Sequence, residues 1–324
     1  MSVVVVGDAN VDLELRLPGD TAPRVHANPD PRLFGGGSAA NTAAALGRLG
    51  VPCRFVGSVG DDVYGRFAVS SLAEAGVDTD HVQVSAESPT VTVIAVTRQS
   101  GDRIIYVWPP SGGAHGELTP QVAIDAIVGA SWLHVSGICL RVAPARDAVL
   151  AAMERARAAS VPVSFDLNLR LENWGWDSEF RTAVEHAMAR CDVMFGGAFD
   201  EISALAGVDD PVAAAEQLSG AGRLVIARRG VEGAIACSGG RVLAAPGFAV
   251  AVTDTIGAGD AFNAGFIAAR VGGGDVASGL AWGNAVAALT ITRPGARSTP
   301  TAAEAAHLVT GGGNDGRPLA GEGC

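Results

Sequence analysis

Short apolar runs alternate with longer segments of helical periodicity along the chain, most regularly from residue 132 onward. The apolar runs predict strands at residues 3–6, 51–59, 132–135, 161–165, 192–195 and 224–227, and the helical segments lie at 39–49, 60–75, 144–159, 178–189 and 275–290. Strands that alternate with helices of this length form βαβ units, whose sheet is parallel and covered on both faces. The pattern therefore predicts an α/β fold, a three-layer α/β/α sandwich with a mostly parallel central sheet.

Residues 90–97 and 103–108 form two further strand-like runs, separated only by a short polar segment that is typical of a hairpin turn. We expect both runs to leave the main sheet and to form a small second sheet. The predicted organisation is one domain, residues 1–310, whose small sheet comes from parts of 11–34 and 88–110. The glycine-rich residues 311–324 are expected to form a disordered tail.

Composition and charge exclude several classes of partner. The chain has 324 residues, 48% of them hydrophobic, and its 34 acidic and 23 basic side chains give a formal charge of -11. Such a chain has no global attraction for nucleic acid or for an anionic membrane. The five cysteines form no Cys-x-x-Cys pair and the N-terminus has no basic leader, so we expect a soluble, cytoplasmic protein with reduced thiols and no zinc.

The segment with the most chemistry is residues 254–262, DTIGAGDAF, which opens into an apolar helix. Gly257, Ala258 and Gly259 carry almost no side chain, so their N–H groups can converge on an anion at the positive end of the helix. Asp260 follows in the first turn, where it suits a base that takes a proton from an attacking hydroxyl. The alternative is an ordinary helix start, in which the aspartate only complements the dipole. The residues alone leave both interpretations open.

Polar side chains also follow the predicted strands. Asn10 and Asp12 come after the first strand, and Asp166, Asn168 and Arg170 come after strand 161–165. Open α/β sheets bind ligands at the carboxyl ends of their strands. For the residues taken alone, an Asx turn at the end of a strand would be the commoner explanation of Asn10 and Asp12.

Two segments together resemble the ribokinase-type (PfkB) carbohydrate kinases. Residues 254–262 resemble the C-terminal signature of that family, and residues 35–43, GGGSAANTA, resemble its N-terminal signature. The resemblance runs from about residue 2 to about residue 308. It implies a ribokinase-like fold, a β-lid over the sugar formed by the small sheet, and transfer of a phosphoryl group from ATP to a sugar hydroxyl.

The resemblance also implies roles for single residues. On the sugar side it points to Asp12, Gly36, Gly37 and Asn41, beside the strand-end candidate Asn10. Arg103 could reach the substrate from the lid, although a solvent-facing arginine on an edge strand is the commoner case. Arg170 matches an arginine that serves phosphate or an acidic sugar.

On the nucleotide side the resemblance points to Asn168, Arg228, Gly230, Gly233 and Asn284. Asn284 falls where family members contact adenine, and a polar contact between helices explains it nearly as well. The chain lacks a Walker P-loop, so phosphate binding falls to the segment around Gly257.

Metal ions follow from the same resemblance. Glu201 matches a glutamate that organises Mg²⁺-bound water, but Ala198 replaces the usual asparagine of that element. A monovalent cation such as K⁺ is implied at Asp254 and the carbonyls of Ile256, Thr290, Arg293 and Gly295.

These expectations converge on an ATP-dependent sugar kinase that acts on ribose, fructose or a related sugar or sugar acid and forms a homodimer through the lid. His115 stands where the family usually has asparagine, so the sugar stays open. A nucleoside kinase of the same family and a sugar- or nucleotide-binding sensor without turnover are the alternatives.

Overall fold

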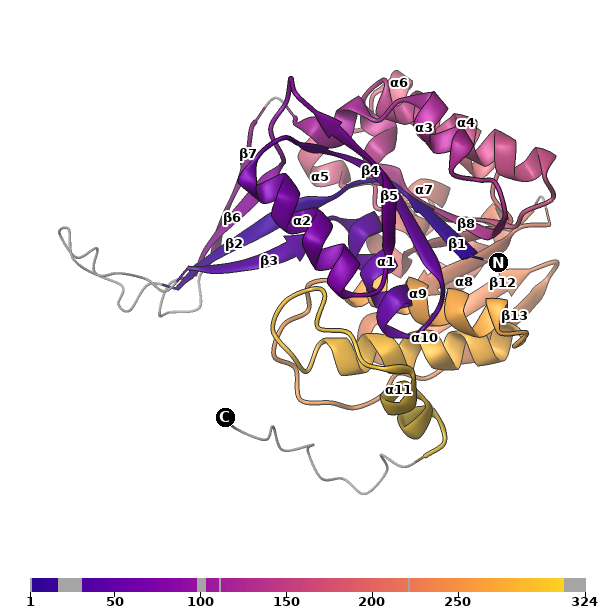
Figure 1. Cartoon of the computed structure of the whole chain (residues 1–324). Coiled ribbons are helices and arrows are strands. Elements are labelled where there is room, and N and C mark those ends of the chain that lie inside the picture. The colour runs from indigo at the N-terminus through magenta and orange to yellow at the C-terminus, as the bar shows by residue number, and fades with distance from the viewer. Residues whose placement is uncertain (1, 17–30, 98–102, 111, 221, 312–324) are drawn as a thin grey trace.

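The computed structural model describes residues 2–16, 31–97, 103–110, 112–220 and 222–311. Within these ranges a nine-stranded sheet has the order β13-β12-β11-β10-β9-β8-β1-β4-β5 (Figure 1). Its strands are β1 (Ser2–Val6), β4 (Cys53–Gly60), β5 (Asp78–Ser85), β8 (Ala130–Ser136), β9 (Val163–Asp166), β10 (Val193–Gly197), β11 (Leu224–Arg228), β12 (Ala234–Ser238) and β13 (Arg241–Ala245). The expected hairpin turn at 98–102 and tail residues 312–324 lie outside the described residues.

The sheet is parallel except at one edge, where β12 and β13 pair antiparallel to their neighbours. Strand β1 shows why both faces are covered: Val4 and Val6 pack into one hydrophobic core, while Val3 and Val5 pack into the other. Uninterrupted apolar strands of this kind are typical of parallel sheets between two helical layers. The predicted three-layer sandwich is confirmed.

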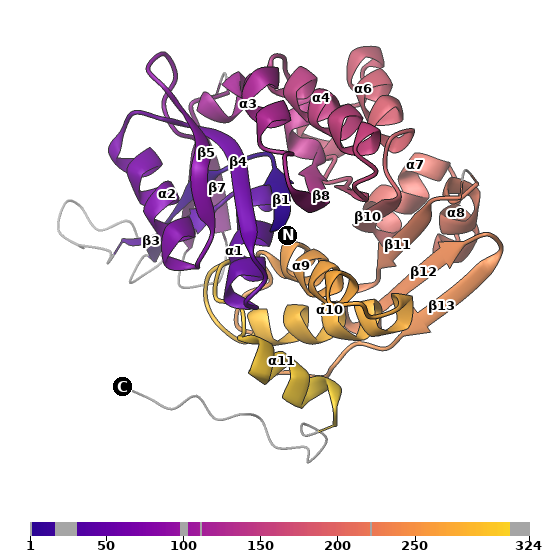
Figure 2. The same ribbon diagram turned by 45° about the vertical axis from the view of Figure 1, so that its right-hand side comes forward.

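Helices α3 (Pro120–Asp125), α4 (Ala145–Ala158), α6 (Ser178–Met188) and α8 (Pro211–Leu218) cover one face. The other face carries α1 (Ser38–Arg48), α2 (Val63–Glu74), α9 (Ala258–Val271) and α10 (Val276–Thr290), as Figure 2 shows. The remaining helical segments are η1 (Ala114–Glu117), η2 (Gly137–Arg141), α5 (Leu171–Trp174), η3 (Ala198–Ser203), α7 (Ala204–Ala206), η4 (Gly230–Glu232) and α11 (Ala302–Val309). No helix of the described ranges is long and apolar enough to cross a membrane.

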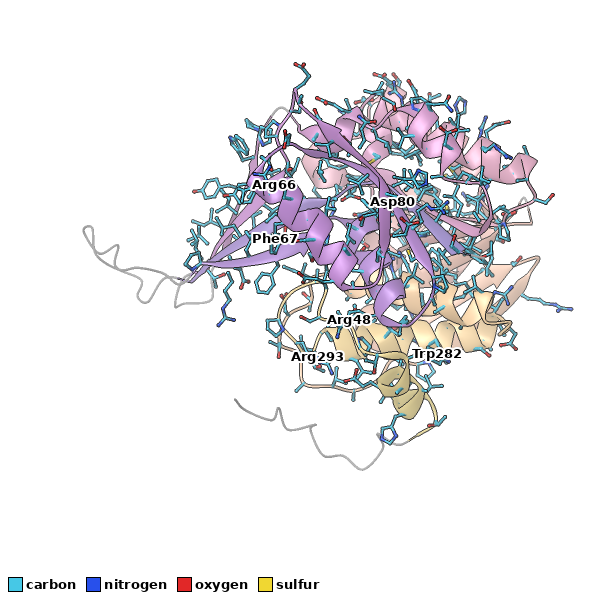
Figure 3. The ribbon with its side chains drawn as sticks, viewed as in Figure 1. Arg48, Arg66, Phe67, Asp80, Trp282 and Arg293 are labelled. Atoms are coloured by element: carbon cyan, nitrogen blue, oxygen red, sulfur yellow. The ribbon has the colours of Figure 1, made fainter. Side chains whose placement is uncertain are left out.

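A separate four-stranded sheet, which we call the lid, projects from the main body (Figure 1). Its order is β3-β2-β6-β7, with β2 (Asn10–Arg16), β3 (Arg32–Gly36), β6 (Thr92–Thr97) and β7 (Arg103–Trp108). The side chains of residues 104–108 are all more than a third exposed, and side chains stand out from the lid on its outer side (Figure 3). The predicted small sheet is confirmed. Asn10 and Asp12 lie within lid strand β2, and not in the Asx turn that was the alternative explanation of these residues.

Helices α9 and α10 pack closely because a glycine on each helix leaves room for atoms of the other. A Cβ on Gly265 would lie 2.7 Å from the Trp282 carbonyl oxygen, and one on Gly283 would lie 2.8 Å from the Phe262 ring. This packing fixes the start of α9 against the sheet, and the start of α9 carries the predicted anion site.

Candidate active site

The turn that opens α9 has the geometry expected of an anion site. Gly257 is the N-cap, with a left-handed φ of 78°, and a Cβ there would lie 2.8 Å from Ala296. A Cβ on Gly259 would lie 3.3 Å from the guanidinium of Arg228. Since the first N–H groups of a helix have no acceptor within the helix, they can bind an anion in front of it.

Asp260 joins the two sequence signatures. Its carboxylate accepts a hydrogen bond from Ser38 Oγ at 2.7 Å and from Asn41 Nδ2 at 3.0 Å, both on α1. Burial, together with the charge of Asp166, raises its pKa to about 7, against these two hydrogen bonds, which lower it. A carboxylate that titrates near neutral pH beside an anion site can accept a proton from a hydroxyl.

Asp8, at the end of β1, sets the position of α1. Its carboxylate accepts from the N–H of Ser38 at 2.9 Å and of Ala39 at 3.2 Å. Gly37, with φ 96°, brings the chain so close that a Cβ would lie 2.6 Å from the Asp8 carbonyl oxygen. We did not single out Asp8 or Ser38 from the sequence, although Ser38 lies inside the N-terminal signature.

The predicted sugar residues of the lid lie opposite one another across β2 and β3. Asn10 Nδ2 donates to Asp12 Oδ1 at 2.9 Å, and a Cβ on Gly36 would lie 2.6 Å from the Asn10 amide and 2.8 Å from the Asp12 carboxylate. Arg103 begins β7, and its side chain lies outside the described part of the structure. Arg170 is exposed on the loop after β9 with a left-handed φ of 49°.

A further residue, Arg297, enters this group from the loop after α10. Its guanidinium donates to Asn41 Oδ1 at 3.2 Å, to Ser71 Oγ at 2.9 Å and to the Gly36 carbonyl oxygen at 2.8 Å. Burial lowers its pKa to about 10, against the charges of nearby carboxylates including Asp12. Arg297 belongs to no recognised motif, so its contacts with residues far away in the chain could not be predicted from the sequence.

A charged cluster around Arg228 lies next to the turn that opens α9. Arg228 donates to Asp166 Oδ1 at 2.8 Å, to Asn263 Oδ1 at 2.8 Å and to the Gly259 carbonyl oxygen at 3.3 Å. Burial alone would lower the pKa of Arg228, but the carboxylates of Asp166 and Glu201 outweigh that effect and raise it. The predicted nucleotide residue Arg228 therefore lies against the α9 turn, with its charge balanced by Asp166 and by Glu201 3.6 Å away.

Glu201 lies on the π-helical turn η3 and is almost fully buried. Its two carboxylate oxygens accept from the N–H of Leu169 at 2.9 Å and of Gly197 at 2.7 Å, and it lies 3.6 Å from Arg228. Burial and the charge of Asp166 raise its pKa. Ala198 beside it is buried.

The other predicted nucleotide residues lie on two turns and one helix. Gly230 and Gly233 have left-handed φ values of 58° and 87°, and a Cβ on Gly233 would lie 2.1 Å from the Ala245 carbonyl oxygen. Asn284 Nδ2 donates to the carbonyls of Ala245 at 3.1 Å and Pro246 at 3.0 Å. Asn168 is half-buried with φ 37°, a left-handed conformation that is uncommon for non-glycine residues but is adopted by asparagine more readily than by most.

The residues expected around a monovalent cation are tied together by Asp254. Its carboxylate accepts from the N–H of Ile256 and of Gly295, both at 3.1 Å. The Thr290 carbonyl accepts from Arg293 N–H at 3.2 Å. The two segments that would supply carbonyl ligands therefore lie next to each other. Among the described residues, no group of three or more His, Cys, Asp or Glu side chains could hold a metal ion by itself.

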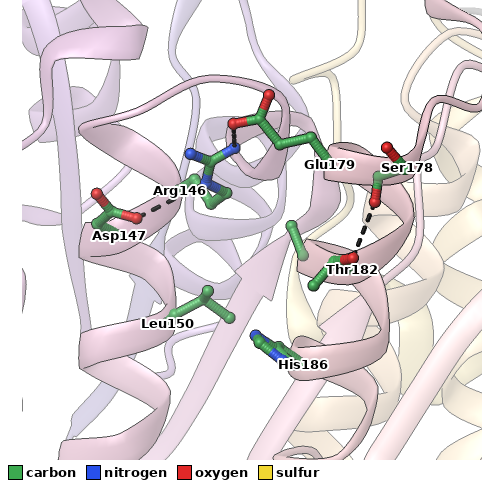
Figure 4. Close-up of a pocket in the computed structure, with 8 residues that line it drawn as sticks. Arg146, Asp147, Leu150, Ser178, Glu179, Thr182 and His186 are labelled. Atoms are coloured by element: carbon green, nitrogen blue, oxygen red, sulfur yellow. Dashed lines mark hydrogen bonds and ion pairs between the residues drawn. The ribbon is translucent and has the colours of Figure 1, made fainter.

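A surface groove of about 410 Å³ lies elsewhere, between α4 and α6 (Figure 4). Its one arginine, Arg146, is paired with Asp147 at 3.7 Å and with Glu179 at 2.7 Å. The groove contains none of the predicted site residues, and the charge of Arg146 is already neutralised by two carboxylates. It is therefore not the candidate site.

Comparison with known proteins agrees with this geometry. The model of the family described as pfkB family carbohydrate kinase matches residues 1–303. A fructokinase of Klebsiella pneumoniae is 34% identical over 267 residues, 82% of each chain. A 5-dehydro-2-deoxygluconokinase of Bacillus subtilis is 31% identical over 281 residues, which cover 85% of this chain and 86% of that protein.

Solved structures agree as well. The crystal structure of fructokinase from Xylella fastidiosa with bound ATP has a TM-score of 0.83 at 26% identity, over 95% of this chain and 98% of that one. A double mutant of Vibrio cholerae fructokinase, with fructose, ADP and potassium ion bound, has a TM-score of 0.79 at 28% identity, with the same coverage. The prediction of a sugar kinase is thereby confirmed. The chain belongs to the pfkB family of carbohydrate kinases, which are phosphotransferases with an alcohol group as acceptor.

Proposed function

We propose that this kinase transfers the γ-phosphoryl group of ATP to a hydroxyl of a small sugar or sugar acid, with Asp260 as the general base. One observation carries the proposal: Asp260 lies in the first turn of α9 and is held there by Ser38 and Asn41 from the N-terminal signature. The base, the anion site and the predicted sugar residues then meet in one place.

In the proposed reaction, Asp260 accepts the proton of the acceptor hydroxyl as its oxygen bonds to the γ-phosphorus. The bond between that phosphorus and the β,γ-bridging oxygen breaks, and ADP leaves. The N–H groups of Gly257, Ala258 and Gly259 stabilise the charge on the transferred group. The raised pKa of Asp260 supports this role, because a base works best when its pKa lies near the working pH.

Acceptor binding is assigned to Asn10, Asp12, Asn41 and the Gly36–Gly37 backbone, with Arg103 and Arg170 as further candidates. Carboxylate and amide groups suit a polyol, because a carboxylate accepts two hydroxyl protons at once. The two relatives are named for different acceptors, so the proposal covers a sugar and a sugar acid.

For the nucleotide we propose Asn168, Gly230, Gly233 and Asn284, with the Arg228 charge beneath the phosphates. Mg²⁺ would arrive with ATP and neutralise phosphate charge, and Glu201 would hold it through water, since Mg²⁺ commonly keeps several waters and is bound through one or two carboxylates. A monovalent cation such as K⁺ would bind at Asp254 and the carbonyls of Ile256, Thr290, Arg293 and Gly295.

We also propose that the protein is cytoplasmic and that the lid covers the acceptor and forms a homodimer contact. The exposed side chains of β7, among them Ile105 at 58% and Tyr106 at 57%, support this contact, since an isolated small sheet is only marginally stable. Replacing both with serine should convert a dimer into a monomer in analytical ultracentrifugation. A wild-type monomer at micromolar concentration would remove the dimer and leave the kinase.

The test of the proposed function is an ADP-release assay with Mg-ATP over a panel of sugars, sugar acids and nucleosides. Acceptor-dependent ADP release with one sugar or sugar acid supports the proposal. Turnover with nucleosides alone would favour a nucleoside kinase, and binding of a sugar without ADP release would favour a sensor.

A further inference from the structure

We infer that Arg297 is a positioning residue that orients the Asn41 amide toward Asp260 and thereby sets the proton affinity of the base. The inference rests on the proposed role of Asp260. Arg297 lies on the loop after α10, directly after Ala296, which contacts the N-cap Gly257 of the anion site. One loop therefore reaches both the phosphate side and the acceptor side of the site.

Arg297 determines which way the Asn41 amide group faces. A guanidinium group donates only, so the Asn41 atom that Arg297 Nε contacts at 3.2 Å must be the amide oxygen. The Asn41 amide nitrogen then points to Asp260 Oδ2, 3.0 Å away. Without Arg297 the amide could turn over and present its oxygen to the carboxylate, which would favour a protonated Asp260.

The hydrogen bonds of Arg297 also hold its side chain in one position. Arg297 also donates to the Gly36 carbonyl and to Ser71 Oγ, so its fork joins β3 and α2 as well as α1. The space exists because position 35 is glycine: a Cβ there would lie 2.2 Å from the guanidinium. Three contacts from one planar group leave little freedom to the side chain, as is typical of arginine in positioning roles.

The charged groups around Asp260 also affect its affinity for a proton. Asp260 is surrounded by two carboxylates, Asp166 and Asp8, which raise its pKa, and by two guanidinium groups, those of Arg228 and Arg297, whose charges interact with it. Arg228 is already paired with Asp166. On the acceptor side, Arg297 therefore supplies a positive charge and the amide orientation, and both favour the ionised form of Asp260.

The experiment measures kcat/KM for the best acceptor of the panel against pH, because that ratio reports the pKa of the base in the free enzyme. We expect Arg297→Met to move the acid limb upward by about 0.5 to 1 pH unit, since it loses both effects. Arg297→Lys keeps the charge but cannot make the three-way contact, so it should move the limb less and raise KM for the acceptor.

A matched control comes from the same loop. Arg48 Nε donates to the Thr299 carbonyl at 2.7 Å, and within the described residues Arg48 forms no hydrogen bond or ion pair with a predicted site residue. Arg48→Met removes an arginine anchor of the loop and should leave the acid limb in place. If Arg48→Met moves the limb as far as Arg297→Met does, then loosening of the loop explains the shift and the inference is wrong.

A double variant tests the route through Asn41. In an Asn41→Ala background, Arg297→Met should shift the limb by less than half as much as in the parent protein, because no amide is left to orient. An equal shift in both backgrounds would show that Arg297 acts through its charge alone. Should Arg297→Met fail to fold by circular dichroism, Arg297→Gln replaces it with the same expectations.

The Asp260→Asn and Arg297→Met variants together distinguish a failure of this inference from a failure of the proposed function. If Asp260→Asn keeps its turnover, Asp260 is not the base and both claims fail. If Asp260→Asn loses turnover while Arg297→Met leaves the acid limb unmoved, only the role of Arg297 is refuted.

Discussion

The two halves of the candidate site are built in different ways. On the acceptor side, Asp12, Asn41, Asp260 and Arg297 come from separate elements and are positioned largely by contacts between side chains. On the nucleotide side the main features are backbone turns at glycines, and Asn284 is bonded to main-chain carbonyls. A turn presents its backbone N–H groups with any sequence that lets the turn form. A network of side chains, in contrast, changes with each substitution. We therefore expect acceptor choice to change easily on this scaffold, while nucleotide binding depends on backbone shape.

The largest effect should come from pH, and it should appear on the acceptor side alone. The pKa of Asp260 lies near 7, above the ordinary 3.8, so the base is lost as pH falls through 7. Below that pH, kcat/KM for the acceptor should fall about tenfold per unit, or about a hundredfold from pH 8 to pH 5. ATP binding, measured by calorimetry without acceptor, should change much less. A flat kcat/KM profile from pH 5 to 8 would contradict the raised pKa.

The next effect tests the backbone of the nucleotide side. Gly233→Val places a branched side chain at φ 87° and 2.1 Å from a carbonyl oxygen. The turn must move, so we expect KM for ATP to rise about tenfold and the free energy of unfolding to fall by about 1 to 3 kcal/mol. Gly230→Ala is the comparison: a Cβ there meets no atom within 4 Å, so the variant adds only the strain of alanine at φ 58°, and KM for ATP should rise less. If both variants leave KM for ATP unchanged, this turn does not border the nucleotide.

A smaller effect is expected at Asn284. Its two hydrogen bonds hold the carbonyls of Ala245 and Pro246, so Asn284→Ala should lower the free energy of unfolding by about 1 to 2 kcal/mol. Family resemblance adds a contact with adenine, which predicts a rise of a few fold in KM for ATP but not for GTP. Equal changes for both nucleotides would leave Asn284 a structural residue.

The smallest effect is expected at Ala198. Asparagine there restores the amide usual in the family, so Mg²⁺ use should improve or stay unchanged, and the buried site should cost about 1 kcal/mol of stability. The measurement is turnover against Mg²⁺ concentration at fixed ATP. Loss of activity in a folded Ala198→Asn protein would mean that this element, including Glu201, was aligned wrongly.

The fold was predictable because its signals are local. The alternation of apolar strands and amphipathic helices predicted the central sheet, and two strand-like runs without a helix between them predicted the lid. Strands β12 and β13 were missed, and so was the edge strand β5. Their runs are short or polar, and pairing in the sheet decides their conformation.

Single residues of the site were predictable only where they lie inside a motif. Asp260 and Asn41 each belong to a signature, so they could be identified before their contact was known. Arg297 and Asp8 act through contacts with partners 261 and 30 residues away in sequence, which no local pattern encodes. Arg228 was identified, but its burial against Asp166 depends on the order of strands in the sheet.

The central claim is that Asp260 takes the proton of the acceptor. Its most direct test is single-turnover phosphorylation by Asp260→Asn with acceptor and Mg-ATP saturating. Asparagine keeps the shape and removes the acceptor of the proton, so the rate should fall on the order of a hundredfold or more. The variant should also unfold at a higher temperature at pH 8 but not at pH 4. The raised pKa of Asp260 means that its ionised form destabilises the folded protein, and asparagine carries no charge. A single-turnover rate within a few fold of the parent protein would contradict the account, since an aspartate that only complements the helix dipole can be replaced at little cost.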